Sequence, residues 1–338
     1  MSSLVASISF GRWIAIVLAV ALVAAFPLFY ENPYYMTVIV TGEIVLLLNI
    51  SWNFILGMAG VWNFAQLAVY ALGAYGSGWL MLHETWLPVP LAIVCGGLLA
   101  AGISLLLAFP TLRLFGIYTS LLTFSFAEVI QYAATNNPGG LTGGSFGFPA
   151  VGGLFPSYGQ TSYLRAYYWV CAACCLGGCL AVAWLRRSHL GIALRSARDA
   201  PQYTAARGID LRSARIAAFG LSGFLAGIAG GLYLAFEQSF TTDQMGLTPM
   251  SLDVTMLVIG GLGTVTGPII GTAIVVAIQT WLISYPGWQL TVLGTILLVI
   301  VVFVPGGVVG LVVRIDSRIR LWVREDAEPE PSSSSGPP

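Results

Sequence analysis

The side chains that could do chemistry in this sequence are single polar groups within long apolar stretches. A polar or charged group at membrane depth is costly, so each is by default a candidate for a transport pathway or a proton relay. A structural role stays open for several of them, since Glu43 could be a neutral core carboxyl and Glu128 a structural hydrogen-bonding group. The candidates are Glu43, Asn49, Asn53, Asn63, Gln66, Glu128 and Asp253.

The basic residues exclude several kinds of catalysis. All fourteen are Arg and none is Lys. A Walker loop that binds ATP phosphates ends in Gly-Lys-Ser/Thr, so another chain must hydrolyse ATP if ATP drives this protein. Schiff-base chemistry also needs a lysine, and the HExxH motif of zinc metalloproteases does not occur in the sequence. We expect no enzymatic activity and no cofactor.

Cysteine is concentrated in one apolar stretch, which holds Cys171, Cys174, Cys175 and Cys179. The first two form a CxxC, but a zinc site requires a second pair or histidines at matching spacing. The two histidines, His83 and His189, lie outside the stretch. A free cysteine behaves as a small apolar residue, so helix packing is favoured over a metal or redox site.

The elements that position these residues must be membrane helices. The sequence has 338 residues, of which 57% are hydrophobic and 8% charged, whereas soluble domains carry roughly 25% charged residues. Each span needs about 20 apolar residues. Residues 1–324 are therefore expected to form one permease domain, an all-α, polytopic transmembrane helical bundle with about ten membrane segments, some of them short or broken. The apolar stretches are 13–30, 37–57, 64–82, 89–109, 116–135, 166–185, 214–236, 252–283 and 288–312.

Arginine sets the predicted orientation, because positively charged loops stay in the cytoplasm. Seven of the fourteen lie between Arg186 and Arg215, and four follow the last span. We therefore predict cytoplasmic termini and a retained first helix instead of a cleaved signal peptide. Residues 325–338 are acidic and then rich in Pro and Ser, so we predict a disordered cytoplasmic tail.

Two stretches are predicted to depart from simple spans. The stretch 252–283 must return to its starting side if residues 284–287 form an external turn. The run Gly260-Gly261-Leu262-Gly263 offers the reversal point, so two short spans or a re-entrant pair are expected, with the break covered by protein or water. The stretch 136–162 is rich in Gly and Pro, which favours an external, non-helical loop.

Small residues recur at helical spacing and predict close helix packing. Gly223, Gly227 and Gly231 form one double GxxxG, and Gly263, Gly267 and Gly271 form another. Packing within the chain is favoured over an interface between subunits.

The cytoplasmic segment 191–208 reads GIALRSARDAPQYTAARG and is too long for a simple connector. A short helix from about Ala193 to Arg198 would place Leu194 and Ala197 along one side and the two arginines along another. Such a helix could fit a groove on a partner protein and transmit its movement.

This segment resembles the coupling loop of ABC importer permeases, in the version found in branched-chain amino acid permeases. The resemblance covers about 250 residues and is closest to the larger, M-type subunit. It extends in order through TLRLFGIYTSLLTFSFAEVIQ (111–131), LTGGSFGF (141–148), FLAGIAGGLY (224–233), VIGGLGTVTGPIIG (258–271) and FVPGGVVG (303–310).

The resemblance implies a multi-pass subunit in the plasma membrane of a prokaryote that moves branched-chain or related amino acids. It implies as partners a second homologous permease, two cytoplasmic ABC ATPase subunits and an extracytoplasmic solute-binding protein. The bilayer surrounds the chain, and no nucleic acid is expected. The implied ATPase-coupling residues are Gly191, Leu194, Arg195, Ala197, Arg198, Asp199, Ala205 and Gly208. The candidate substrate pathway is Asn63, Gln66, Glu128, Thr142, Gly143 and Gly144.

Two positions depart from the family pattern. Gln66 stands where a titratable His is typical of the partner permease, which keeps hydrogen bonding but removes a pH switch. Gly306 stands where Arg is frequent. Alternatives therefore stay open: a urea or short-chain amide ABC permease, a self-sufficient secondary carrier driven through Glu43 or Glu128, or a passive channel.

Overall fold

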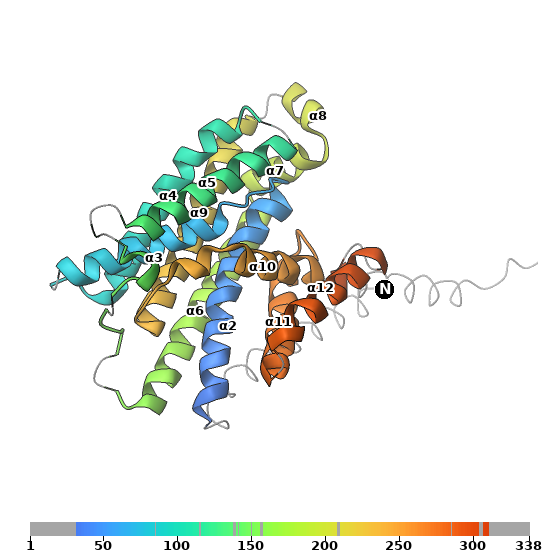
Figure 1. Cartoon of the computed structure of the whole chain (residues 1–338). Helices are drawn as coiled ribbons and strands as arrows, with labels where there is room; N and C mark the ends of the chain where they lie inside the picture. Colours follow the sequence, from blue (N-terminus) through green and yellow to red (C-terminus); the bar gives the residue numbers. More distant parts are fainter. Residues whose placement is uncertain are drawn as a thin grey trace, which may run out of the picture.

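The computed structural model describes residues 32–310, apart from 85, 115, 138–139, 141, 150, 156–157, 208–209, 285 and 304–306. Within these residues the chain is a bundle of helices with no strand, and one isolated antiparallel bridge joins Phe148 and Phe240. The prediction of an all-α bundle is confirmed (Figure 1). The helices are α2 (Pro33–Asn53), α3 (Gln66–His83), α4 (Val89–Thr111), α5 (Ile117–Asn136), α6 (Gln160–Arg187), α7 (His189–Asp199), α8 (Pro201–Ala206), α9 (Leu211–Glu237), α10 (Leu247–Gly260), α11 (Gly267–Trp281) and α12 (Pro286–Phe303).

Every apolar stretch predicted from residue 37 onward contains a helix. In the described part of the chain, four helices are long and apolar enough to cross a membrane: Pro33–Met58, Val89–Thr111, Gln160–Arg187 and Leu211–Glu237. Helices α10 and α11 are shorter but also apolar. The predicted first span, 13–30, the domain limit at 324 and the tail 325–338 lie outside the described residues.

Helices α3, α4 and α9 form a tightly packed core in which glycines bring the backbones together. A Cβ at Gly73 would lie 2.3 Å from Gly227 Cα, and one at Gly223 would lie 2.4 Å from Ser104 Cβ. Because these neighbours are backbone atoms or short side chains, nothing larger fits without moving a helix. The first double GxxxG therefore packs within the chain, as predicted.

Helix α2 links this core to the rest of the molecule, because it contacts α6, α9 and α11. It begins with Asn32, whose side chain accepts a hydrogen bond from Tyr34 N, and with Pro33 in the first turn, both typical of helix starts. It ends in a π-helical turn, Phe54–Met58, which was not predicted. The predicted break near Gly260 is confirmed, since α10 ends there and α11 begins at Gly267.

The predicted external loop is largely irregular, with one 3-10 turn at Gly144–Phe146. Helix α6 begins at Gln160, slightly before the predicted end of the loop. The loop is fastened to the residues just after α9, because Phe148 N donates to Phe240 O at 2.7 Å and Val151 N donates to Gln238 O at 3.2 Å. Its glycines supply turns, and these bonds hold the turns in place.

Candidate functional site

The segment between α6 and α9 folds into two helices, α7 and α8, at one end of the bundle (Figure 1). Ser188 separates α6 from α7, and its hydroxyl accepts a hydrogen bond from Gly191 N at 3.4 Å. The structure therefore contains the predicted short helix. The helix is longer than predicted because this serine starts it at His189.

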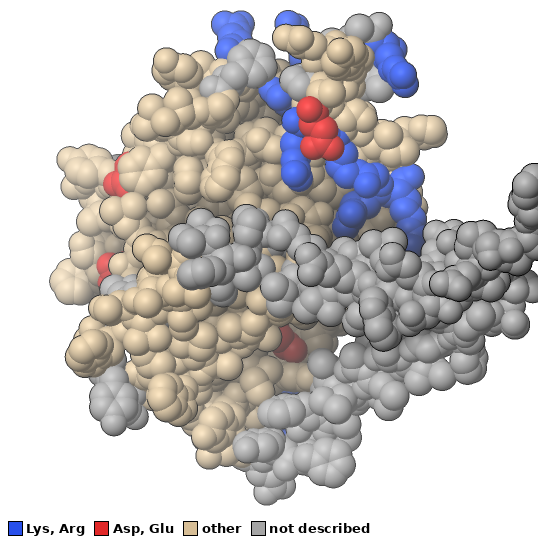
Figure 2. All heavy atoms as spheres, turned by 90° about the vertical axis from the view of Figure 1, so that its right-hand side faces the viewer, with Lys and Arg blue, Asp and Glu red and all other residues tan. Residues whose placement is uncertain are grey.

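Arginine side chains gather over the same end of the molecule (Figure 2). The exposed ones are Arg113, Arg187, Arg198, Arg207 and Arg212. Acidic groups among them are few. Asp210 caps α9, where the Ser213 hydroxyl and the Arg212 amide hold the pKa of its carboxyl below the usual range. The surface at this end is cationic and suited to an acidic or mixed partner surface.

Helix α7 has one buried side and one polar side. Leu194 is fully buried, and Ala193 and Ala197 are also buried. Ile192 is 49% exposed, and Tyr203 on α8 is 79% exposed. The apolar side of α7 is thus covered by this chain, so a partner can reach only the outer edge of α7 and α8.

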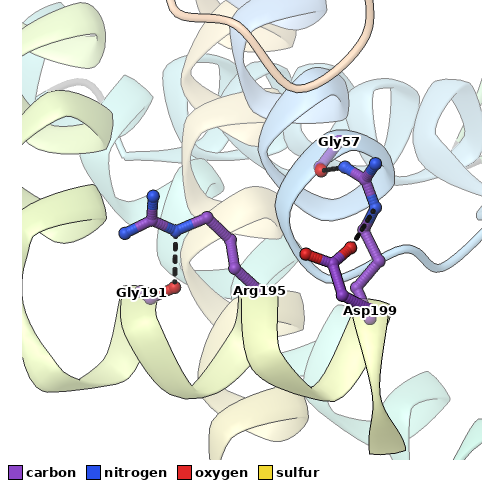
Figure 3. A network of polar contacts seen from close by, with 5 residues as sticks. Gly57, Gly191, Arg195 and Asp199 are labelled. Atoms are coloured by element: carbon purple, nitrogen blue, oxygen red, sulfur yellow. Dashed lines mark hydrogen bonds and ion pairs between the residues drawn. The ribbon is translucent and has the colours of Figure 1, made fainter. Parts of the chain in front are cut away.

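The two central arginines of α7 bind backbone atoms of this chain (Figure 3). Arg195 Nε donates to Gly191 O at 3.2 Å, and its Nη2 donates to Arg186 O at 2.7 Å. Arg198 Nη1 donates to Gly57 O at the end of the π-helical turn, and its Nε lies 3.5 Å from Asp199 Oδ1. Arg195 ties α7 to α6, whereas Arg198 ties α7 to the end of α2.

The other predicted coupling residues lie along the same segment. A Cβ at Gly191 would lie 2.1 Å from Leu185 O, so only glycine fits where α7 folds back against α6. Asp199 is 72% exposed at the end of α7. Ala205 lies in α8, but its side chain, like all of Gly208, is outside the described residues.

A groove of about 580 Å³ runs between α7 and the start of α9. It is lined by His189, Leu190, Ile192, Ala193, Asp210, Ser213, Ala214 and Ala217. The groove opens beside the exposed edge of α7, so side chains of a partner could enter it.

Asn63 and Gln66 form one buried hydrogen-bonded network. Asn63 Nδ2 donates to Gln66 Oε1 at 3.1 Å. Gln66 Nε2 donates to Ser51 Oγ at 2.8 Å and to Ser222 Oγ at 2.9 Å, and both amides are almost fully buried. The network joins the end of α2, the start of α3 and the middle of α9.

Glu128 lies apart from that network, on the exposed side of α5. Among the described residues its carboxylate has no hydrogen-bond or ion-pair partner. Its neighbours on this side are Leu121, Ser125, Val129 and Tyr132, all exposed. A carboxylate facing lipid would be costly, so this side of α5 is expected to meet protein or water.

Thr142, Gly143 and Gly144 close the end of α5. Thr142 Oγ1 donates to Ala134 O at 2.6 Å, and Asn137 Oδ1 accepts from Thr142 N at 2.8 Å. A Cβ at Gly143 would lie 1.9 Å from Gly147 O. Phe146, next in the turn, is completely exposed. The predicted pathway residues thus fall into two groups, one between α2, α3 and α9 and the other along α5 and the loop after it.

Glu43 lines a different cavity, a groove of about 880 Å³ whose described walls come mostly from α2 and α11. Its Oε2 is buried without a hydrogen-bond partner in the described part of the chain. The walls include Tyr35, Ile39, Gly42, Tyr168, Thr272 and Val276. Among the described residues, Glu43 shares no hydrogen bond with either group of predicted pathway residues.

The clustered cysteines of α6 pack into the bundle. Cys171 and Cys175 are buried, and Cys175 Sγ donates to Glu43 O at 3.0 Å. All five cysteines are free thiols. In the described residues no three His, Cys, Asp or Glu side chains are grouped as a metal site would require.

Two residues of the site were not predicted. Ser51 and Ser222 complete the Gln66 network but are 171 positions apart in the sequence, so no local pattern pairs them. Asn53, one of the polar candidates in the apolar stretches, binds the break between α10 and α11, because its Nδ2 donates to Thr264 O at 2.6 Å.

Comparison with known proteins gives one family. A family model described as the permease component of branched-chain amino acid transport systems matches residues 34–305. The chain is 24% identical to the high-affinity branched-chain amino acid transport system permease protein LivM of Escherichia coli over 287 residues, which is 78% of this chain and 67% of LivM. It is also 24% identical to LivM of Salmonella typhimurium over 290 residues, with the same coverage.

A shorter similarity leads to the probable branched-chain amino acid transport permease protein LivH of Methanocaldococcus jannaschii. The identity is 37% over 101 residues, 30% of this chain and 31% of the relative. No solved structure matches the chain.

Proposed function

The chain belongs to the family of branched-chain amino acid transport permeases, and on this premise we propose that it moves branched-chain or related amino acids across a prokaryotic inner membrane. It acts as a membrane-spanning subunit of an ABC importer. A separate ATPase supplies the energy, since this sequence contains no lysine for a phosphate-binding loop.

The observation that carries the proposal is the helix pair α7 and α8. Residues 189–206 form two short helices at the arginine-rich end of the molecule. Their inner side is fixed to the bundle through Leu194 and Arg198, so a push on their outer edge must move the membrane helices. We propose that two ATPase subunits close beneath the complex and that one of them pushes this edge.

The other partners follow from the same architecture. The exposed side of α5 carries Ser125 and Glu128 among apolar residues. Because a carboxylate facing lipid is costly, this side is proposed to face a second, homologous permease, with the substrate pathway between them. A solute-binding protein would deliver the amino acid to the opposite surface, where the loop 137–159 lies.

Purification in mild detergent tests this assembly. A tagged form of the chain, extracted from its native membrane, should elute with an ATPase, a second permease and a solute-binding protein, which mass spectrometry identifies. The ligand of the co-purified binding protein then distinguishes an amino acid from urea or a short amide. Recovery of this chain alone, still active in uptake, would refute the importer and favour a secondary carrier or channel.

A cysteine at the exposed edge of α7 tests the contact with the ATPase. Ile192→Cys, in a background without the five native cysteines, should cross-link to the ATPase subunit and not to the permease partner. Leu106→Cys on α4, which is 68% exposed on an apolar side of the bundle, is the control and should not cross-link to the ATPase. Cross-linking to the ATPase from Leu106→Cys and not from Ile192→Cys would show that α7 is not the docking element.

A further inference from the structure

Three backbone segments that are not regular α-helix meet beside Arg198. They are the end of the π-helical turn at Gly57, the connection around Gly60, and the break between α10 and α11 at Gly263. A Cβ at Gly57 would lie 2.4 Å from both Gly263 N and Gly263 Cα. The end of α2 and the break therefore touch through their backbones.

The Arg198 side chain contacts all three segments. Its Nη1 donates to Gly57 O, a carbonyl at a helix end that lacks the full set of helical partners. Its stem covers Gly60, where an added Cβ would lie 2.6 Å from Arg198 Cγ. An added Cβ at Gly263 would lie 3.2 Å from Arg198 Nη1. Gly60 and Gly263 both have positive φ, of 68° and 80°, which glycine tolerates and other residues resist.

Asn53 fastens the break to α2 from the other side. Its Nδ2 donates to Thr264 O at 2.6 Å, and its Oδ1 accepts from Gly263 N at 2.8 Å. Asn53 is 4% exposed. Both ends of one buried amide are thus used to hold the turn between α10 and α11, so a displacement at the end of α2 is passed directly to that turn.

The connection around Gly60 also reaches α5. Thr123 Oγ1 accepts a hydrogen bond from Phe64 N at 3.0 Å and lies 3.4 Å from Trp62 O. Thr123 is on α5, five residues before Glu128. The same connection therefore leads from Arg198 toward the helix proposed to line the substrate pathway.

We propose that Arg198 is the positioning residue that transmits movement of α7 to the broken helices, through Gly57 to the α10–α11 turn and through the 59–65 connection to α5. This inference rests on the proposed role of α7 in contacting the ATPase. The π-helical turn and the α10–α11 turn lack a regular ladder of helical hydrogen bonds, so they can change conformation while the α3, α4 and α9 core stays rigid. Arg198 acts on these two places and not on the core.

Uptake per ATP hydrolysed is the quantity that tests the role of Arg198. In proteoliposomes that contain the purified complex, Arg198→Ala should leave the Ile192→Cys cross-link and ATP hydrolysis in place. It should lower uptake per ATP by about tenfold, within the usual range of coupling between sites. Arg198→Lys keeps the charge and most of the stem but lacks the guanidinium fork. It should restore only part of the lost uptake per ATP. Leu106→Ala, on the exposed apolar side of α4 and outside the arginine-rich surface, is the control and should behave as the native complex.

A double variant distinguishes transmission from simple packing. Asn53→Ala alone should also lower uptake per ATP, since it frees the turn at Gly263 and Thr264. If both residues act through that turn, Arg198→Ala with Asn53→Ala should lose no more than the stronger single variant does. Losses that multiply, or an unchanged ratio in Arg198→Ala, would overturn the proposal. If the complex with Arg198→Ala does not assemble, the uptake per ATP hydrolysed of Arg198→Lys tests the proposal instead. A native complex without ATP-driven uptake would instead refute the proposed function.

Discussion

Gln66 illustrates how a buried polar residue can hold helices together in this protein. Its amide bonds Ser51 on α2 and Ser222 on α9, and Asn63 donates to its oxygen. Hydrogen bonds between membrane helices contribute about 0.6 kcal/mol each on average, whereas leaving a buried polar group without a partner costs about 1–3 kcal/mol. Removal of the Gln66 side chain should therefore cost more free energy of unfolding than its hydrogen bonds contribute.

Gln66→Ala is expected to destabilise the chain by about 2 kcal/mol, because Asn63 and the two serines lose a shared partner in a buried position. The measurement is thermal unfolding of the purified complex in detergent. Gln160→Ala, an exposed glutamine at the start of α6, is the matched control and should unfold like the native protein. Native stability together with altered substrate affinity in Gln66→Ala would show that the amide serves passage and not packing.

Glu128 should be reachable from water if α5 lines the pathway. Glu128→Cys, in a background without native cysteines, is expected to react with a water-soluble, membrane-impermeant thiol reagent in the assembled complex. Saturating substrate should slow the reaction. Leu106→Cys on α4 should stay unreactive, since lipid covers it. Equal reactivity of Glu128→Cys and Leu106→Cys would show that α5 does not line the pathway.

The residue types of these sites could be predicted from the sequence, but not their partners. Single polar residues in apolar stretches identified Asn63, Gln66 and Glu128. Whether each is buried or exposed depends on which helices are neighbours, and Ser222 lies 156 positions from Gln66. Likewise, the resemblance implied Arg195 and Arg198 as ATPase-coupling residues, yet both bind backbone carbonyls of this chain.

At the scale of elements, the broken helix is built on backbone contact. A Cβ at Gly271 would lie 1.8 Å from Met256 O, and one at Gly260 would lie 1.9 Å from Gly267 O. Helices α10 and α11 therefore cross with no side chains between them. Sequence predicted this break from a glycine run and from the need to return to one side. The π-helical turn at the end of α2 has no comparable signal, since Phe54–Met58 reads as a continuation of the helix.

Gly271→Ala should destabilise this crossing by about 1–3 kcal/mol, because the added methyl forces the two backbones apart. Thermal unfolding of the purified chain is again the measurement. Gly102→Ala is the matched control, since nothing lies within 4 Å of the added Cβ in the middle of α4. The control should be neutral or gain up to about 1 kcal/mol from better helix propensity. If Gly271→Ala and Gly102→Ala unfold alike, α10 and α11 do not cross as closely as described.

At the scale of the whole molecule, charge predicts an orientation of the bundle in the membrane. The arginine-rich end carries α7 and α8 (Figure 2), and positively charged loops stay in the cytoplasm. The opposite end carries the loop between α5 and α6. Helix order and fold class followed from the composition and from the apolar stretches, because each span must satisfy its own backbone in lipid. The packing of α3, α4 and α9 into one core required the structure.

Accessible cysteines test this orientation. In intact cells without native cysteines, Tyr158→Cys in the loop between α5 and α6 should react with an impermeant reagent. Tyr203→Cys on α8 should react only after the membrane is opened. Both native side chains are well exposed, at 57% and 79%, so burial would not explain a difference. Labelling of Tyr203→Cys in intact cells would show that the bundle has the opposite orientation.

The central claim is that this chain moves amino acids only when a partner ATPase works. The most direct measurement is uptake of radiolabelled leucine, isoleucine or valine into proteoliposomes that contain the purified complex, the solute-binding protein and enclosed ATP. The account predicts uptake that requires ATP, the binding protein and this chain, and that is lost with a non-hydrolysable ATP analogue. Uptake that continues without ATP and follows an imposed ion gradient would contradict it and identify a secondary carrier.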